Sequence, residues 1–139
     1  MIIVLFGQPH SGKTTLAQQL ESNYYIDGDQ LRTMFKNKNY SKEGRINNLN
    51  RASDIATYLH YNGNNVIVSV VYPYKEARNY LNSLVSDVKW IYLTYTEPRG
   101  REGFHVNDFE EPNIENFLQL NTDNLTIEEC ITKIKEYVG

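Results

Sequence analysis

The sequence predicts an α/β fold, a three-layer, doubly wound parallel sheet of five strands. Short apolar and β-branched runs alternate along the chain with segments of helical periodicity, and a glycine-rich turn joins the first run to the first helical segment. Strands that alternate with helices in this way favour a parallel sheet with helices on both faces. Because 139 residues suffice for one such core, we expect a single domain over residues 1–139.

The glycine-rich turn is Gly7–Thr14, in which two glycines separated by four residues precede a lysine and a threonine. This spacing is typical of a P-loop, whose backbone N–H groups bind phosphates at a helix N-terminus. The apolar run 2–6 is expected to form the strand before it, and residues 13–20 the helix after it. The fold is therefore of the P-loop nucleoside-triphosphate hydrolase or kinase type. The predicted ATP-binding residues are Gly7, Gln8, Pro9, His10, Ser11, Gly12, Lys13, Thr14 and Thr15.

Two residues of this loop have expected roles in phosphoryl transfer. Lys13 is expected to bridge the β- and γ-phosphates of ATP, and the Thr14 hydroxyl to hold Mg²⁺. A glycine-rich turn without a ligand is the alternative, but it requires the glycines, the Lys-Thr pair and the flanking elements to coincide.

A second strand, 24–26, runs into Asp27-Gly28-Asp29 and delivers two carboxylates to the sheet edge where open α/β folds bind ligands. Asp27 is expected to reach Mg²⁺, partly through water, or to take a proton from an acceptor hydroxyl. Asp29 is expected to cap a helix over 30–35, and it could also contact the substrate. Lys13 and Asp27 are thus the predicted catalytic residues.

The basic residues gather in one segment, although the formal net charge is −3 and argues against a nucleic-acid scaffold. Between Arg32 and Arg51 there are six basic residues and one acidic residue. Arg45, Asn48 and Arg51 are spaced by three on a helix predicted over 42–61, so they share a face. Alone, a basic segment indicates a solvated face. Beside a nucleotide site, an anionic acceptor is the better interpretation.

The remaining elements follow from the same periodicities. Strands are predicted over 66–71, 88–93 and 116–120, and helices over 75–85 and from a capping box at Thr126–Glu129 onward. Cys130 falls on the inward stripe of the last helix, which predicts a buried, unreactive thiol. The N-terminal apolar run is too short to span a membrane and lacks a cleavage site, so a cytoplasmic protein without a membrane partner is expected.

Motifs along nearly the whole chain resemble the adenylyl-sulfate (APS) kinase family. They are the P-loop, Asp27 to Arg32, Tyr40-Ser41, Arg45 with Asn48 and Arg51, Ser69 to Tyr74, Arg78, Phe104 to Pro112, Leu120 to Thr122, and Thr126 to Cys130. The resemblance implies an ATP-dependent phosphotransferase that moves the γ-phosphate of ATP to the 3′-hydroxyl of adenylyl sulfate, a small nucleotide acceptor.

The resemblance also implies which residues bind the acceptor: Asp29, Arg32, Tyr40, Arg45, Asn48, Val71, Tyr72 and Phe104. The two arginines offer bidentate donors to a phosphosulfate group. Phe104 or Tyr40 offers a flat face to a base, with core packing as the alternative for each. Tyr72 stands where many family members have serine, so its side chain is expected to narrow or reshape the acceptor pocket.

The chain departs from the family after the fourth strand, where a further helix and a lid are reduced to Thr94–Gly103. A lid covers the phosphates and supplies cations, so this loss bears on rate and acceptor choice. Arg99 and Arg101 are the predicted substitute cations. Two alternatives stay open: a kinase for another nucleotide, a nucleoside or a nucleic-acid hydroxyl, and a nucleotide-binding module without transfer. The oligomeric state, with a homodimer as one outcome, is open too.

Overall fold

The computed structural model describes residues 1–9, 11–20, 22, 24–97, 106–112 and 116–139. Five strands form one sheet in the order β2-β3-β1-β4-β5, and every neighbouring pair is parallel. The predicted fold class is therefore confirmed. The elements are β1 (Ile2–Phe6), α1 (Lys13–Gln19), β2 (Tyr24–Asp27), α2 (Gly28–Met34), α3 (Lys42–Tyr61), β3 (Val66–Ser69), α4 (Lys75–Leu84), β4 (Val88–Thr94), β5 (Phe117–Asn121) and α5 (Ile127–Val138).

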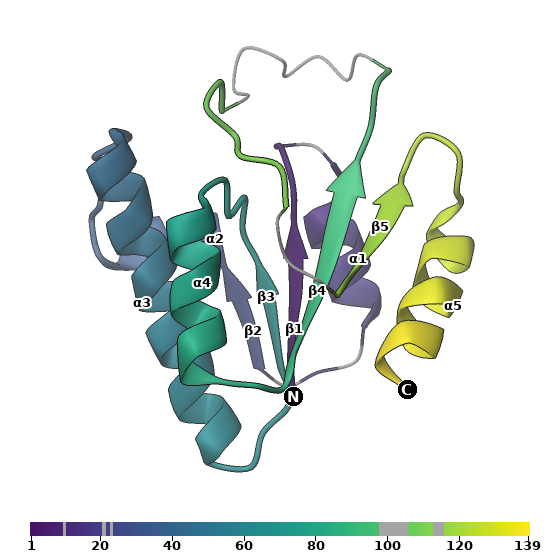
Figure 1. Cartoon of the computed structure of the whole chain (residues 1–139), viewed down its shortest axis with the longest axis horizontal. Coiled ribbons are helices and arrows are strands. Elements are labelled where there is room, and N and C mark those ends of the chain that lie inside the picture. The colour runs from purple at the N-terminus through teal and green to yellow at the C-terminus, as the bar shows by residue number, and fades with distance from the viewer. Residues whose placement is uncertain (10, 21, 23, 98–105, 113–115) are drawn as a thin grey trace.

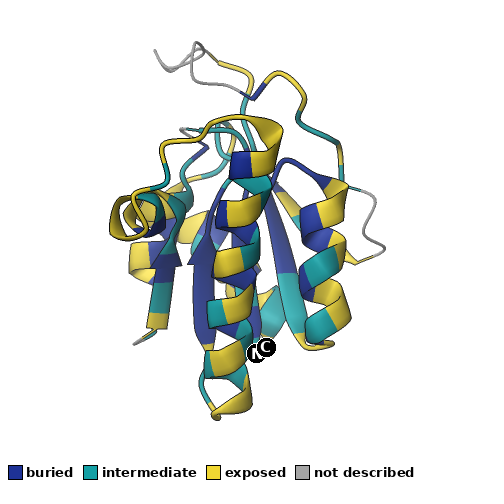
Figure 2. Cartoon of the chain, turned by 90° about the vertical axis from the view of Figure 1, so that its left-hand side faces the viewer, coloured by how far each residue is buried: buried dark blue, intermediate teal, exposed yellow. Residues whose placement is uncertain are grey.

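Helices cover both faces of the sheet, with α3 and α4 on one face and α1 and α5 on the other (Figure 1). Successive residues of β1 alternate between two cores: Val4 and Phe6 pack under α3 and α4, and Leu5 packs under α1 and α5. Figure 2 shows the consequence, a buried sheet between helices whose outer faces are exposed. Because both faces are covered, the central strand β1 is apolar throughout rather than alternating.

The main differences from the predicted boundaries concern the strand ends that border the site. The strand predicted over 66–71 ends at Ser69, and the helix predicted to start at residue 30 starts at Gly28. Asp27 caps that helix, because its backbone is extended and its carboxylate accepts a 3.2 Å hydrogen bond from the N–H of Gln30. The prediction that Asp29 is the cap is wrong, since Asp29 lies in the first turn.

Other local predictions are confirmed. Thr126 and Glu129 form a reciprocal capping box, and Cys130 is buried on the inner face of α5. Gly63, two residues after α3, has a φ of 86°, the left-handed conformation in which helices commonly end. In the described part of the chain, no helix has the length and apolar character needed to cross a membrane.

Candidate active site

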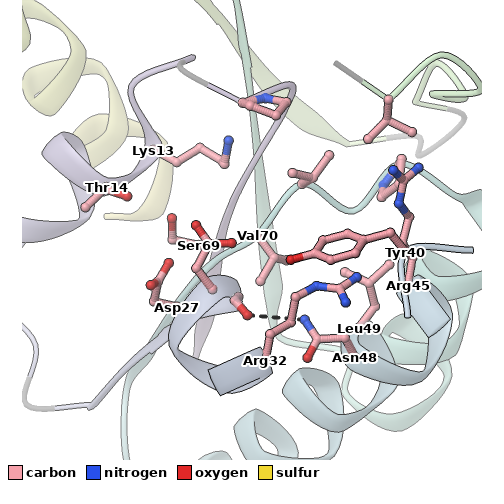
Figure 3. Close-up of a pocket in the computed structure, with 16 residues that line it drawn as sticks. Lys13, Thr14, Asp27, Arg32, Tyr40, Arg45, Asn48, Leu49, Ser69 and Val70 are labelled. Atoms are coloured by element: carbon pink, nitrogen blue, oxygen red, sulfur yellow. Dashed lines mark hydrogen bonds between the residues drawn. The ribbon is translucent and has the colours of Figure 1, made fainter. Parts of the chain in front are cut away.

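A cavity of about 330 Å³ opens where the carboxyl ends of β1, β2 and β3 meet. This is the end of a parallel sheet at which α/β folds bind ligands. Figure 3 shows two groups of side chains along it, with Lys13, Thr14 and Asp27 at one end and Tyr40 and Arg45 at the other. We call these the donor end and the acceptor end.

At the donor end, the P-loop owes its shape to two glycines. Gly7 has a φ of 148°, and a Cβ atom there would lie 2.3 Å from the carbonyl oxygen of Leu93. Gly12 precedes α1 with a φ of 101°, also in the region that favours glycine. The loop folds around the Lys13 side chain, whose Nζ donates hydrogen bonds to the carbonyl oxygens of Gly7 (3.1 Å) and Gln8 (2.9 Å).

The pKa values of the two predicted catalytic side chains, Lys13 and Asp27, differ from their ordinary values. Burial lowers the pKa of Lys13 to about 8, although Asp29 and Asp27 act in the opposite direction. Burial also raises the pKa of Asp27, against the hydrogen bond from the Gln30 N–H. A phosphate group near Lys13 would favour the charged ammonium, because an opposite charge nearby stabilises the charged form.

At the acceptor end, Arg32 organises the loop between α2 and α3. Its guanidinium lies 4.2 Å from the centre of the Tyr40 ring and donates a hydrogen bond of 3.1 Å to the carbonyl oxygen of Asn39. Gly44 lets the same loop pack on α3, since a Cβ there would lie 2.2 Å from that carbonyl oxygen. Tyr40 is 64% exposed, so its ring is available to a ligand.

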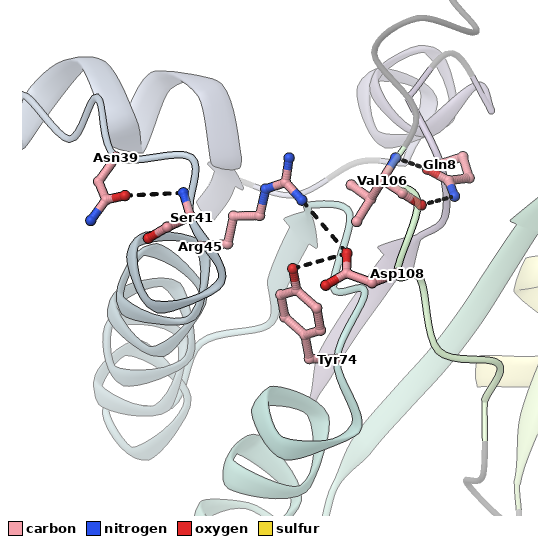
Figure 4. Close-up of polar contacts among 7 residues, drawn as sticks. All are labelled: Gln8, Asn39, Ser41, Arg45, Tyr74, Val106 and Asp108. Atoms are coloured by element: carbon pink, nitrogen blue, oxygen red, sulfur yellow. Dashed lines mark hydrogen bonds and ion pairs between the residues drawn. The ribbon is translucent and has the colours of Figure 1, made fainter.

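Two side chains of α3 face this end of the cavity. Asn48 donates a hydrogen bond of 3.3 Å from Nδ2 to the carbonyl oxygen of Gly28, which ties α3 to the Asp-Gly-Asp turn. Arg45 also lines the cavity and forms an ion pair of 3.8 Å with Asp108, which accepts a further hydrogen bond from Tyr74 (Figure 4). Arg51, predicted to share their face, instead lies 4.5 Å above the Phe35 ring and is not among the described lining residues.

Half of the twenty sequence-predicted site residues line this cavity. Of the other ten, Tyr72 lies in the core, and nine fall into two groups. Gly7, Gln8, Ser11, Gly12 and Thr15 build the loop and the start of α1 without being among the described lining residues. His10, Arg99, Arg101 and Phe104 lie outside the described residues. The predicted residues that line the cavity are Pro9, Lys13, Thr14, Asp27, Asp29, Arg32, Tyr40, Arg45, Asn48 and Val71.

Tyr72 differs from expectation, because its side chain packs in the core. It is fully buried, its hydroxyl lies 2.6 Å from the Ser53 hydroxyl, and its ring packs edge-on against Trp90. A left-handed backbone (φ 47°) turns this side chain inward while its neighbours Val71 and Pro73 line the cavity. The expectation that the Tyr72 side chain narrows the pocket is therefore corrected.

One side chain that shapes the site, Arg78, has no role predicted from the sequence. Arg78 is completely buried and donates hydrogen bonds to the carbonyl oxygens of Tyr72 (2.9 Å), Glu111 (3.3 Å) and Glu110. It thus ties residues 110–111 to the turn after β3. The only sequence signal for Arg78 was its place in the family motifs, because two of its three partners, Glu110 and Glu111, lie more than thirty positions away.

A site for Mg²⁺ needs oxygen ligands, and the donor end offers them. Among the described residues, no group of three or more His, Cys, Asp and Glu side chains could hold a metal ion. Mg²⁺ that binds with a nucleotide uses one or two carboxylates together with phosphate oxygens and water. The Thr14 hydroxyl and the Asp27 carboxylate, both at the donor end, fit that requirement.

The central strand, P-loop and helix, with a cavity that joins the loop to a basic acceptor end, define a P-loop kinase. The family model described as Adenylylsulphate kinase matches residues 1–99. The chain therefore belongs to the adenylylsulphate kinase family.

Individual relatives agree with this assignment. The chain is 29% identical to the adenylyl-sulfate kinase of Rippkaea orientalis, over 95% of this chain and 87% of the relative. The crystal structure of APE1195 superposes with a TM-score of 0.83 at 31% identity, over 99% of this chain and 94% of the other. The Mycobacterium tuberculosis APS kinase CysC, in complex with AMPPNP and APS, shares the fold at 21% identity with a TM-score of 0.79, over 99% and 96% of the two chains.

Proposed function

We propose that this P-loop kinase uses ATP and Mg²⁺ to phosphorylate the 3′-hydroxyl of adenylyl sulfate. The observation that carries the proposal is the single cavity that runs from Lys13 and Thr14 to Arg45 and Asn48. A nucleoside triphosphate at one end and an anionic nucleotide at the other would lie side by side in it. The name of the Rippkaea orientalis relative, adenylyl-sulfate kinase, supports this acceptor.

At the donor end, Lys13 would leave its main-chain partners to bridge the β- and γ-phosphates, and Thr14 and Asp27 would hold Mg²⁺, Asp27 partly through water. When bound there, Mg²⁺ would neutralise charge on the phosphate oxygens. The backbone of the P-loop, from Gly7 to Thr15, surrounds the phosphates. Asp27 has a second candidate role as the group that takes the proton of the acceptor hydroxyl.

At the acceptor end, Arg32 and Arg45 donate to the phosphosulfate, and the Tyr40 ring offers a face to the base. Asp29, Asn48 and Val71 complete the walls of this end. Phe104, Arg99 and Arg101 keep their proposed roles as base-stacking residue and cations, on the strength of the resemblance alone.

The test is a screen of acceptors with purified protein, ATP and Mg²⁺, in which ADP release is measured. We expect release to depend on adenylyl sulfate and to stay at background with AMP, adenosine, a hexose or an oligonucleotide with a free 5′-hydroxyl. Release with one of these and none with adenylyl sulfate would assign a kinase of another acceptor. ATP binding without release in any mixture would assign a nucleotide-binding module.

A further inference from the structure

Two polar atoms on the cavity wall have no hydrogen-bond partner among the described residues, Asn48 Oδ1 and Ser69 Oγ. Both side chains are almost completely buried, Asn48 being 5% and Ser69 2% exposed. Buried polar atoms in folded proteins are nearly always hydrogen-bonded, so an unpaired atom on a cavity wall calls for a partner such as a water molecule, an ion or a ligand. Asn48 is accounted for by the acceptor site. Ser69 has no role in the function proposed above.

The position of Ser69 indicates which ligand its hydroxyl meets. Ser69 is the last residue of β3, paired in register with Asp27 on β2 and with Leu5 on β1, which leads into the P-loop. Figure 3 labels Ser69 on the side of the cavity that also holds Thr14 and Asp27. Ser69 is therefore a neighbour of Asp27 in the sheet and lines the same cavity as Thr14.

The chemistry of this position favours water over a direct metal bond. Mg²⁺ gives up its water molecules reluctantly and usually keeps several when it binds with a nucleotide. A metal-bound water is a strong hydrogen-bond donor, and Ser69 Oγ offers an acceptor that no described residue uses. Protein groups that hold such outer ligands orient the whole metal site.

We propose that Ser69 is a positioning residue, whose hydroxyl holds a water of the divalent-cation shell beside Asp27. The inference rests on the proposed function to the extent that a metal–nucleotide complex binds at Lys13 and Thr14. It does not depend on the identity of the acceptor, so it can be tested with ADP alone.

The test compares Ser69→Ala with Ser53→Ala, which removes a buried serine hydroxyl that has a partner, Tyr72. The first readout is Mn²⁺ affinity in the presence of saturating ADP, measured by electron paramagnetic resonance. We expect Ser69→Ala to weaken Mn²⁺ binding roughly tenfold, the lower end of the range for lost outer-shell partners. Ser53→Ala should leave the Mn²⁺ affinity unchanged. Ser69→Thr, which keeps a hydroxyl, should have most of the parent's Mn²⁺ affinity.

The second readout is thermal unfolding without nucleotide or metal, which separates positioning from a structural role. Ser69→Ala removes an unpaired buried hydroxyl, so its Tm should equal or exceed that of the parent, whereas Ser53→Ala leaves Tyr72 without its partner and should lower the Tm. Unchanged Mn²⁺ affinity in Ser69→Ala, or a Tm lowered as far as in Ser53→Ala, overturns the inference.

The acceptor hydroxyl is a second O–H donor that could meet Ser69. A Ser69→Ala protein with normal Mn²⁺ affinity and a raised KM for adenylyl sulfate would overturn the metal-water assignment in favour of that donor. A parent protein that binds Mn²⁺ and ADP but phosphorylates no adenylyl sulfate contradicts the proposed function and leaves this inference standing. If the parent protein does not bind Mn²⁺ together with ADP, both this inference and the assignment of the donor end to a metal–nucleotide complex are overturned.

Discussion

Gln8 and Val106, 98 positions apart in the sequence, are joined by two hydrogen bonds of 2.9 Å each. The side-chain amide of Gln8 donates to the carbonyl oxygen of Val106 and accepts from its N–H, as a neighbouring strand would (Figure 4). Two positions further on, Asp108 pairs with Arg45. Residues 106–108 therefore connect the P-loop to the acceptor end of the cavity.

Replacement of Gln8 by alanine should loosen the P-loop. The Val106 N–H and carbonyl both lose a partner, so we expect a loss of about 1–3 kcal/mol in the free energy of unfolding together with weaker ATP binding. Urea unfolding and calorimetric titration with ATP measure the two effects. Gln18→Ala, at an exposed position of α1, is the matched control. Equal stability and ATP affinity in the two variants would contradict the role of this contact.

Replacement of Arg78 by methionine should destabilise the fold strongly. The methionine keeps most of the apolar stem but leaves three carbonyl oxygens without their donor, so we expect a loss of about 3 kcal/mol or more. Urea unfolding of Arg78→Met beside Lys133→Ala, which removes an exposed charge, measures it. If the two variants unfold at the same urea concentration, Arg78 does not hold residues 110–111 to the turn after β3.

Truncation of Arg45 should weaken acceptor binding by about 1.5–3 kcal/mol, the range for hydrogen bonds to charged groups, and spare ATP binding. Arg51→Ala is the control, because it removes the same charge from the same helix outside the described cavity lining. The KM values for ATP and for adenylyl sulfate, measured on both variants, test this prediction. A raised KM for ATP with an unchanged acceptor KM would move Arg45 to the donor site.

Cys130 should react slowly with a thiol reagent in the native protein. Its side chain is 2% exposed, and burial, with a smaller contribution from Glu129, raises the pKa of the thiol. A raised pKa leaves less of the reactive thiolate at pH 8 than in a free cysteine. The measurement is the rate at which a disulfide reagent modifies the protein with and without denaturant. Because the chain has one cysteine, the whole signal comes from Cys130. Equal rates in the two conditions would contradict the burial of this thiol.

The donor end was predictable because its signal is local. The glycines, Lys13 and Thr14 occupy one short segment, and their spacing, together with the apolar run before them and the helical periodicity after them, predicts a loop between a strand and a helix. Asp27 was placed correctly at the end of β2, but its capping role was given to Asp29. That error arose because the predicted helix starts two residues too late. Hydrophobic periodicity locates the middle of a helix better than its first and last residues.

Contacts between distant segments were beyond prediction from sequence. Apart from their place in a family motif, nothing in the sequence indicates that Val106 and Asp108 have partners in the P-loop and on α3. Tyr72 was misplaced for a different reason. Its assignment to the acceptor pocket came from the family resemblance, and its left-handed backbone turns the side chain into the core. A position in a motif does not reveal such a local backbone conformation.

The most direct measurement of the central claim follows radioactive phosphate from γ-labelled ATP into adenylyl sulfate, with the labelled position identified on the product. We expect label on the 3′-hydroxyl with the parent protein, and none with Lys13→Ala, which removes the ammonium from the P-loop and keeps the fold. Absence of label on adenylyl sulfate with the parent, or transfer by Lys13→Ala at the parent rate, would contradict the account.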